Sequence, residues 1–105
     1  MIINISRSGS VTVSNPDDFT AFAIIVEHET DAAAFSSAAT SIGSPTPDGH
    51  HLYVAPDRLE SLVNEQRGPD PAWKSGFHRM VAYAAAHGWV DHRGWIRAHI
   101  EPSAL

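Results

Sequence analysis

The segment between Asp70 and Gly88 constrains the fold more than any other part of the chain. Asp70 can cap the first turn of a helix, Pro71 suits its first position, and Gly88 suits the residue just after its end. Apolar residues recur on one side of such a helix, namely Trp73, Phe77, Met80, Val81 and Ala84. The pattern predicts an amphipathic helix over residues 71–87 and a Schellman ending in which Trp89 folds back on the last turn.

Short β-branched or aromatic stretches predict strands, and two further stretches predict shorter helices. The N-terminal region has two strands around a small-residue turn, and the C-terminal region has a second hairpin. The predicted strands cover residues 2–6, 10–13, 51–54, 89–90 and 95–100, and the shorter helices cover residues 32–40 and 56–66. Residues 19–26 fit either a helix or a buried strand, because so short an apolar run has no decisive periodicity. We expect a helical turn there that leads into a strand.

Together these elements predict one α+β domain over residues 1–105. We expect the N-terminal strand pair and the C-terminal hairpin to join in a mostly antiparallel sheet, with the helix over residues 71–87 packed across it. A chain of this length can bury a core without disulfides. The side chains expected in that core are Ile3, Ile5, Val11, Val13, Phe22, Ile25, Leu52, Val54, Leu59, Leu62, Phe77, Met80, Val81, Ala84, Ile96 and Ile100.

The composition excludes several kinds of protein. The chain has no cysteine, which excludes disulfides, thiolate zinc sites, iron–sulfur clusters and cysteine nucleophiles. No N-terminal stretch has the pattern of a signal peptide, and the longest apolar run, residues 21–26, is too short to cross a bilayer. We therefore expect a soluble cytoplasmic protein without membrane contact. Lys74 is the only lysine beside six arginines, which indicates a GC-rich bacterial genome.

Charge is distributed unevenly along the chain. The formal net charge is −5. Residues 1–66 hold nine acidic and two basic residues, whereas residues 67–105 hold three acidic and five basic residues. The acidic total does not favour broad attraction to phosphate, so nucleic acid is not an expected partner. The chain is rich in histidine, with seven imidazoles that become charged as the pH falls.

The last predicted strand carries an unusual face. Strand alternation places Trp95, Arg97, His99 and Glu101 on one side. A solvated strand face has no need of tryptophan, so either another element covers this side or it is a binding surface with an aromatic plate and an arginine fork. On such a surface Arg97 would bind a carboxylate or phosphate, and His99 could exchange a proton.

His87 and His92 lie near Asp91 around the end of the long helix. The helix dipole stabilises a charged imidazole in the last turn, which accounts for a histidine at position 87 without any function. Two imidazoles and a carboxylate could also surround a zinc ion or a ligand carboxylate, but their spacing is no compact helical motif such as HExxH. We therefore predict no metal and no cofactor. His50 and His51 point to opposite sides of a strand and cannot share one ion.

The order of elements from residue 31 onward, ending in a helix and a hairpin, is similar to that of a winged helix-turn-helix domain. The stretch MVAYAAAHGWVDHRG at residues 80–94 resembles the end of a recognition helix that enters its wing. The resemblance implies, as an alternative, a winged-helix fold that binds DNA. Its groove-facing residues would be Lys74, Ser75, His78 and Arg79, with His92 and Arg93 at the wing tip. Only two of these helix residues carry a fixed positive charge, and the alanine-rich second half of the helix cannot read base edges.

No catalytic motif is present, because the serines lack a G-x-S-x-G elbow and the glycines stand singly. The leading hypothesis is therefore a small non-catalytic accessory or binding protein that associates with itself, or with another protein, through the tryptophan, arginine and histidine strand face. The alternative is a small enzyme or ligand-binding protein for an anionic or aromatic small molecule. Its pocket would be lined by His87, His92, Trp95, Arg97 and His99.

Overall fold

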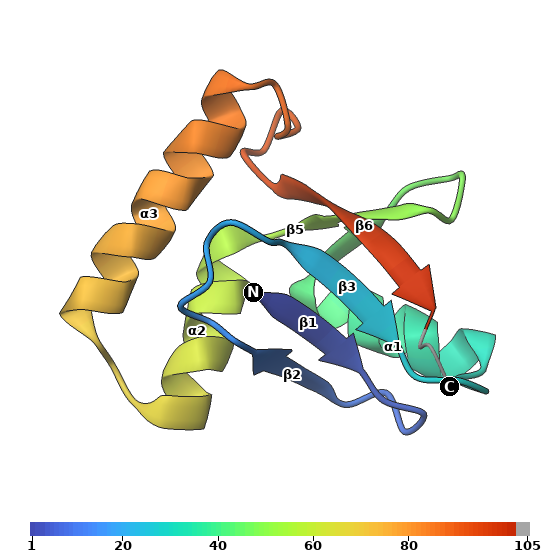
Figure 1. Cartoon of the computed structure of the whole chain (residues 1–105). Helices are drawn as coiled ribbons and strands as arrows, with labels where there is room; N and C mark the ends of the chain where they lie inside the picture. The colour runs from blue at the N-terminus through green and yellow to red at the C-terminus, as the bar shows by residue number, and fades with distance from the viewer. Residues whose placement is uncertain (103–105) are drawn as a thin grey trace.

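The computed structural model describes residues 1–102, which form three helices and one six-stranded sheet (Figure 1). The strands are β1 (Ile2–Ile5), β2 (Val11–Ser14), β3 (Ala23–Val26), β4 (Gly43–Pro45), β5 (His51–Val54) and β6 (Ile96–Pro102). The helices are α1 (Ala32–Ile42), α2 (Pro56–Arg67) and α3 (Pro71–Ala86). The expected α+β class is confirmed.

The sheet is mixed and has the strand order β2-β1-β3-β6-β5-β4. The pairs β1–β2, β5–β6 and β4–β5 are antiparallel, which confirms a mostly antiparallel sheet. The strand β3 lies parallel to both β1 and β6. As a result β6, the last strand in the chain, lies in the middle of the sheet between β3 and β5 (Figure 1).

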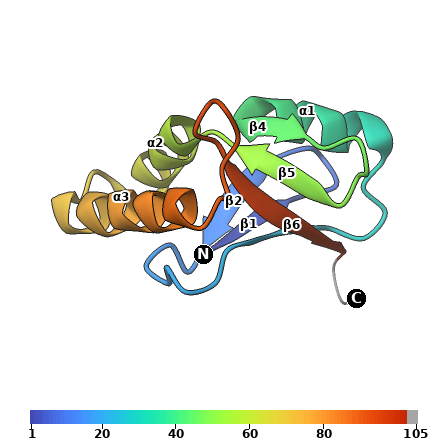
Figure 2. The same cartoon turned by 90° about the horizontal axis from the view of Figure 1, so that it is seen from above.

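The helices α1 and α2 cover one face of the sheet and leave the other open. Both lie behind the sheet in Figure 1 and above it in Figure 2. Strand alternation turns Ile3, Ile24 and Leu52 toward this covered side, where they are fully buried. The alternate residues form the uncovered side, called the open face here: Ile2, Asn4, Ala23, Ile25, His51, Tyr53, Arg97, His99 and Glu101.

Helix α3 lies beside α2 and reaches the sheet at β6. As predicted, the Asp70 side chain caps it by accepting hydrogen bonds from two backbone N–H groups of the first turn, at 3.0 and 3.3 Å. The buried indole of Trp73 stacks on Phe77 at 5.0 Å and donates to the carbonyl of Pro16 at 2.7 Å. These contacts fasten the first half of α3 to the segment that precedes β3. The expected ending is also present, since the Trp89 N–H donates to the Ala84 carbonyl at 2.9 Å.

The predicted C-terminal hairpin is present in a minimal form. Val90 forms an antiparallel bridge to Ile96, flanked by hydrogen bonds from Asp91 N–H to the Trp95 carbonyl at 3.0 Å and from Arg97 N–H to the Trp89 carbonyl at 2.9 Å. The main partners of β6 are β3 and β5, because the arm between the end of α3 and the turn at 91–94 is too short to pair further. The winged-helix alternative is wrong, because the strand that would form the second arm of the wing is a central strand of a six-stranded sheet.

Residues 19–26 resolve into a turn followed by the strand β3, as expected. The expected core is correct except for Ile25, which lies half-buried on the open face, while Ile24 is fully buried. Ile24 pairs with Ile3 in β1 and with Ile100 in β6, and these three residues share the covered side. A shift of one residue in the assumed strand exchanges the two faces, which is why the prediction chose the wrong isoleucine.

Candidate functional site

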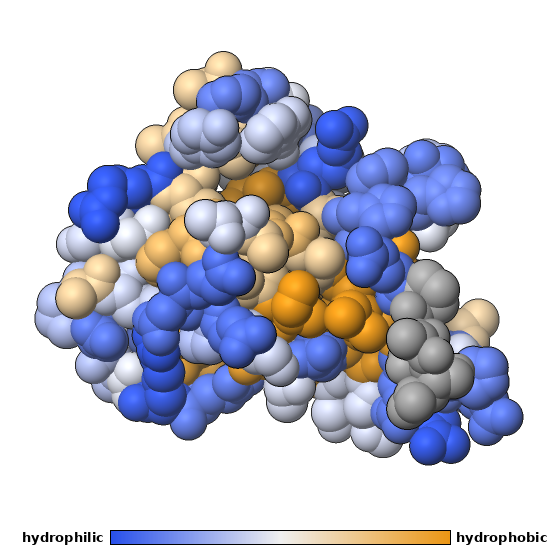
Figure 3. All heavy atoms as spheres, in the orientation of Figure 1, coloured by the Kyte–Doolittle hydropathy of each residue, from blue (hydrophilic) through white to orange (hydrophobic). Residues whose placement is uncertain are grey.

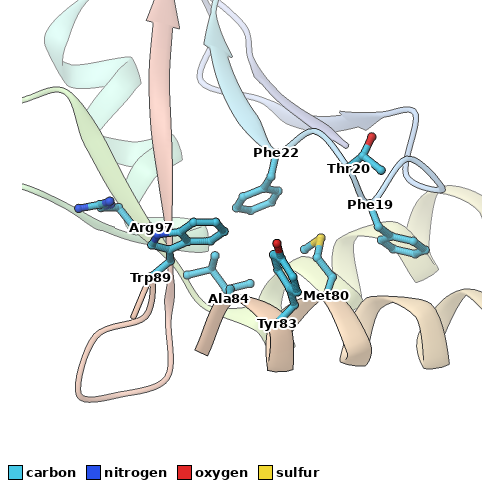
Figure 4. Close-up of a pocket in the computed structure, with 9 residues that line it drawn as sticks. Phe19, Thr20, Phe22, Met80, Tyr83, Ala84, Trp89 and Arg97 are labelled. Carbon is cyan, nitrogen blue, oxygen red and sulfur yellow. The ribbon is translucent and has the colours of Figure 1, made fainter. Parts of the chain in front are cut away.

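A hollow of about 560 Å³ lies between the C-terminal half of α3, the segment before β3 and the start of β6 (Figure 4). We call it the aromatic pocket. Its lining residues are Phe19, Thr20, Phe22, Met80, Tyr83, Ala84, Trp89, Ile96 and Arg97. Four of the nine are aromatic and one is charged, so the hollow has a largely apolar wall with a single cation.

Local folding explains why these side chains meet. Met80, Tyr83 and Ala84 follow helical spacing and so share one side of α3. Phe19 is set against that helix because Gly76 leaves room for its ring: a Cβ atom at Gly76 would lie 2.5 Å from the Phe19 ring. Phe22 enters from the end of the same segment and faces Tyr83 across the hollow in Figure 4.

Three rings stack along the rim of the aromatic pocket. The ring centre of His87 lies 4.1 Å from that of Tyr83 and 4.8 Å from that of Trp89. The Nδ1 atom of His87 is 2.9 Å from the backbone carbonyl of Tyr83, so Nδ1 is the donor of this hydrogen bond. Tyr83 and Trp89 are the two large apolar residues that remain well exposed, at 59% and 43%, among the described residues.

Arg97 is the charged residue of the lining. Its backbone N–H donates to the Trp89 carbonyl at 2.9 Å, which holds the two residues side by side. Figure 4 shows the guanidinium pointing away from the rings, so it is the stem of Arg97 that lies nearer the pocket. No ion pair involving Arg97 is present within residues 1–102.

Trp95 lies outside the aromatic pocket, immediately before β6. The guanidinium of Arg93 lies 3.8 Å from the centre of its ring and that of Arg58 lies 5.3 Å from it. Asp91 organises this turn by accepting from the backbone N–H groups of Arg93 and Trp95 at 2.8 and 3.0 Å. Burial raises the pKa of Asp91, but the hydrogen bonds from Arg93 and Trp95 outweigh it and bring the pKa below its usual value. His92 is exposed in the same turn.

His99 lies on the open face, with its ring edge toward His51 at 5.3 Å between centres. The five predicted site residues therefore fall in three places. Arg97 and His87 belong to the aromatic pocket and its rim, Trp95 and His92 to the turn before β6, and His99 to the sheet. No three histidine, aspartate or glutamate side chains of the described part of the chain converge as metal ligands.

Sequence reasoning missed most of the pocket wall. Phe19 and Phe22 were ambiguous between helix and strand, and Trp89 was assigned to the helix ending and to a short strand over residues 89–90. The available signal was Tyr83, a large aromatic residue three positions after Met80 on the predicted helix. Among the positions suggested by the winged-helix likeness, His78 is hydrogen-bonded to Glu60 at 3.0 Å.

Comparison with known protein families, with curated proteins and with solved structures gives no significant match. Within residues 1–102, none of the helices combines the length and the hydrophobicity needed to cross a membrane.

Proposed function

We propose that this chain is a binding protein whose aromatic pocket takes a small aromatic molecule that carries an acidic group. The observation that carries the proposal is the pocket itself, a hollow of about 560 Å³ with aromatic side chains on opposite sides. This volume lies within the range of about 300–1,000 Å³ that is usual for small-molecule sites.

The exposed rings supply the driving force for binding. Tyr83 and Trp89 keep 59% and 43% of their surface in water, and a flat aromatic ligand between them and Phe22 would remove part of that surface. Aromatic pairs contribute about 0.5–1.5 kcal/mol beyond the area that they bury. Contiguous exposed apolar surface of this kind is typical of a ligand or partner site.

Arg97 favours an anionic ligand. Its side chain is the one charged group of the lining, and the residues that line the pocket contribute no carboxylate that would neutralise it. The guanidinium points away from the rings in Figure 4, so binding of an acid requires the side chain to rotate toward the pocket mouth. An acidic group at the mouth of the pocket could form a bidentate pair with the guanidinium while the ring lies inside. The lining itself contributes no histidine, aspartate or glutamate.

Titration of the protein with 1-naphthoate, followed by tryptophan fluorescence, tests the proposal. We expect saturable binding that Trp89→Ala weakens at least about tenfold, through lost stacking and apolar contact. Trp95→Ala, at the tryptophan outside the pocket, is the matched control and should leave the affinity unchanged. Arg97→Gln should weaken naphthoate about threefold and leave neutral 1-naphthamide unaffected. Equal loss in both tryptophan variants, or no saturable binding by the wild type, would refute the proposal.

A second candidate function is self-association through the open face. This face lacks a covering helix, and Figure 3, which views it, shows hydrophobic surface near its centre between hydrophilic flanks. Ile2 and Ile25 are half-buried there, and Arg97 and His99 are exposed. Sedimentation velocity in the presence of a chelator should then show a dimer that His99→Asp converts to monomer. A wild-type monomer at the highest soluble concentration would rule this function out.

A further inference from the structure

We propose that His51 and His99 chelate a transition-metal cation of the Zn²⁺ class on the open face of the sheet. The two residues lie on neighbouring antiparallel strands, β5 and β6, and the register pairs them directly. Their ring centres are 5.3 Å apart with an angle of 71° between the ring planes. This site is separate from the aromatic pocket, which neither histidine lines.

The ladder position brings these two side chains as close as a sheet allows. Ile100 N–H donates to the His50 carbonyl at 2.8 Å, so residues 50 and 100 form a hydrogen-bonded pair. Hydrogen-bonded and non-hydrogen-bonded pairs alternate along an antiparallel ladder, which makes His51 and His99 a non-hydrogen-bonded pair. The side chains of a non-hydrogen-bonded pair approach each other more closely than those of a hydrogen-bonded pair.

The observed ring separation matches a chelate. Zinc binds imidazole nitrogen at about 2.0–2.1 Å in a tetrahedral arrangement, which places the centres of two bound rings roughly 5 Å apart. The rings of His51 and His99 already have this separation, at 5.3 Å. A cation can therefore be taken up by side-chain rotation, without a change in the strands.

Asp48 faces the nitrogen of His51 that a chelate would leave free. Its Oδ2 atom lies 3.7 Å from Nδ1 of His51, which leaves Nε2 of that ring for the cation. Asp48 is itself held in place, because its other oxygen accepts from the backbone N–H of His50 at 2.8 Å. A carboxylate behind a metal-bound imidazole is the common arrangement in zinc sites, where it fixes the ring and raises its basicity.

Charged neighbours and free coordination positions surround the histidine pair on the open face. Glu101 and Arg97 lie two residues to either side of His99 on the same side of β6, so one carboxylate and one guanidinium flank the pair. Two imidazoles occupy two of the four positions of a zinc ion and leave the others to water. An open coordination sphere of this kind is typical of zinc ions that bind a further ligand, whereas closed four-ligand sites are structural.

Equilibrium dialysis of the untagged protein against Zn²⁺ alone at pH 7.5 tests the chelate. Removal of an outer-sphere partner already weakens metal sites by about 10–100-fold, so loss of a ligand in His51→Asn or His99→Asn should weaken binding at least about tenfold. His92→Asn, at an exposed imidazole outside the pair, is the matched control and should keep wild-type affinity. Unchanged affinity in both pair variants, or an equal loss in the control, would overturn the proposal.

A measurement on the wild type keeps the test independent of variant folding. Substoichiometric Cu²⁺ should broaden the imidazole proton resonances of His51 and His99 before those of the other histidines, because paramagnetic broadening falls steeply with distance. We expect one bound ion per chain. A stoichiometry of one ion per two chains, with a doubled molecular mass, also supports the chelate if His51→Asn and His99→Asn each abolish the doubling. A second copy of the chain would then complete the coordination sphere. Uniform broadening of all histidines contradicts it.

Discussion

The side-chain amide of Gln66 is hydrogen-bonded to the backbone of Val13 in both directions. Val13 N–H donates to Gln66 Oε1 at 2.7 Å, and Gln66 Nε2 donates to the Val13 carbonyl at 3.0 Å. Val13 belongs to β2, the strand at one edge of the sheet, and Gln66 lies near the end of α2. The amide thus occupies the place that a peptide group of a further strand would take. Edge strands with free groups of this kind recruit other chains.

Gln66→Ala should therefore expose the edge of β2. We expect a loss of about 1–2 kcal/mol in the free energy of unfolding from the two lost hydrogen bonds. We also expect concentration-dependent association through the freed edge. Urea unfolding and sedimentation velocity measure the two effects. Glu65→Ala, at the exposed neighbour on the same helix turn, is the control, and equal behaviour of the two variants would contradict this role.

Gly76→Ala should be destabilising, although alanine favours helices. The new Cβ would lie 2.5 Å from the Phe19 ring, and overpacking of this kind costs about 1–3 kcal/mol, against about 1 kcal/mol gained in helix propensity. In a Phe19→Ala background the clash is absent, so the same change should stabilise the protein by about 0.5–1 kcal/mol. A double-mutant cycle in urea measures this change of sign. The same sign in both backgrounds would show that Phe19 does not depend on Gly76.

Stability should fall in acid partly through Asp17. Its hydrogen bonds from Arg67, at 2.8 and 2.9 Å, lower the pKa of Asp17 in the folded protein below the unfolded value. The ionised carboxylate therefore stabilises the fold at pH values above about 4, and this contribution is lost as the pH falls through the folded pKa. Urea unfolding between pH 7 and pH 2 should show a smaller decrease for Asp17→Asn than for the wild type. Arg67→Gln should make this loss of stability smaller by the same amount. A loss as large as that of the wild type in either variant would refute the contribution of the Asp17–Arg67 pair.

Local signals predicted the elements that depend on local chemistry. The limits of α3 followed from Asp70 and Gly88, whose side-chain cap and backbone conformation are both present. The strand β6 and its bridge to Val90, the nearest partner along the chain, were predicted. Its main partners were not, because pairing with β3 and β5 depends on contacts across the chain that no local pattern encodes.

In the candidate site, too, some features follow from local sequence signals and others depend on tertiary contacts. Arg97 and His87 were candidates from the sequence, and the structure places Arg97 in the pocket lining and His87 against the rings of Tyr83 and Trp89. Phe19 and Trp89 belong to one pocket only because α3 ends beside the segment that precedes β3, which is a tertiary relationship. The pairing of His51 with His99 depends on strand register, and a slip of one residue would place the two rings on opposite faces.

The central place of β6 dictates when this chain can fold. Without residues 96–102, the strands β2, β1 and β3 form one ladder and β5 and β4 another, with no strand pairing between the two. Both ladders then present a bare edge along β3 and β5. Folding on the ribosome must accordingly wait for this last strand, which closes both ladders in a single step. Pairings between distant parts of a chain slow folding, and until β6 is in place a growing chain depends on protection of its two unpaired edges.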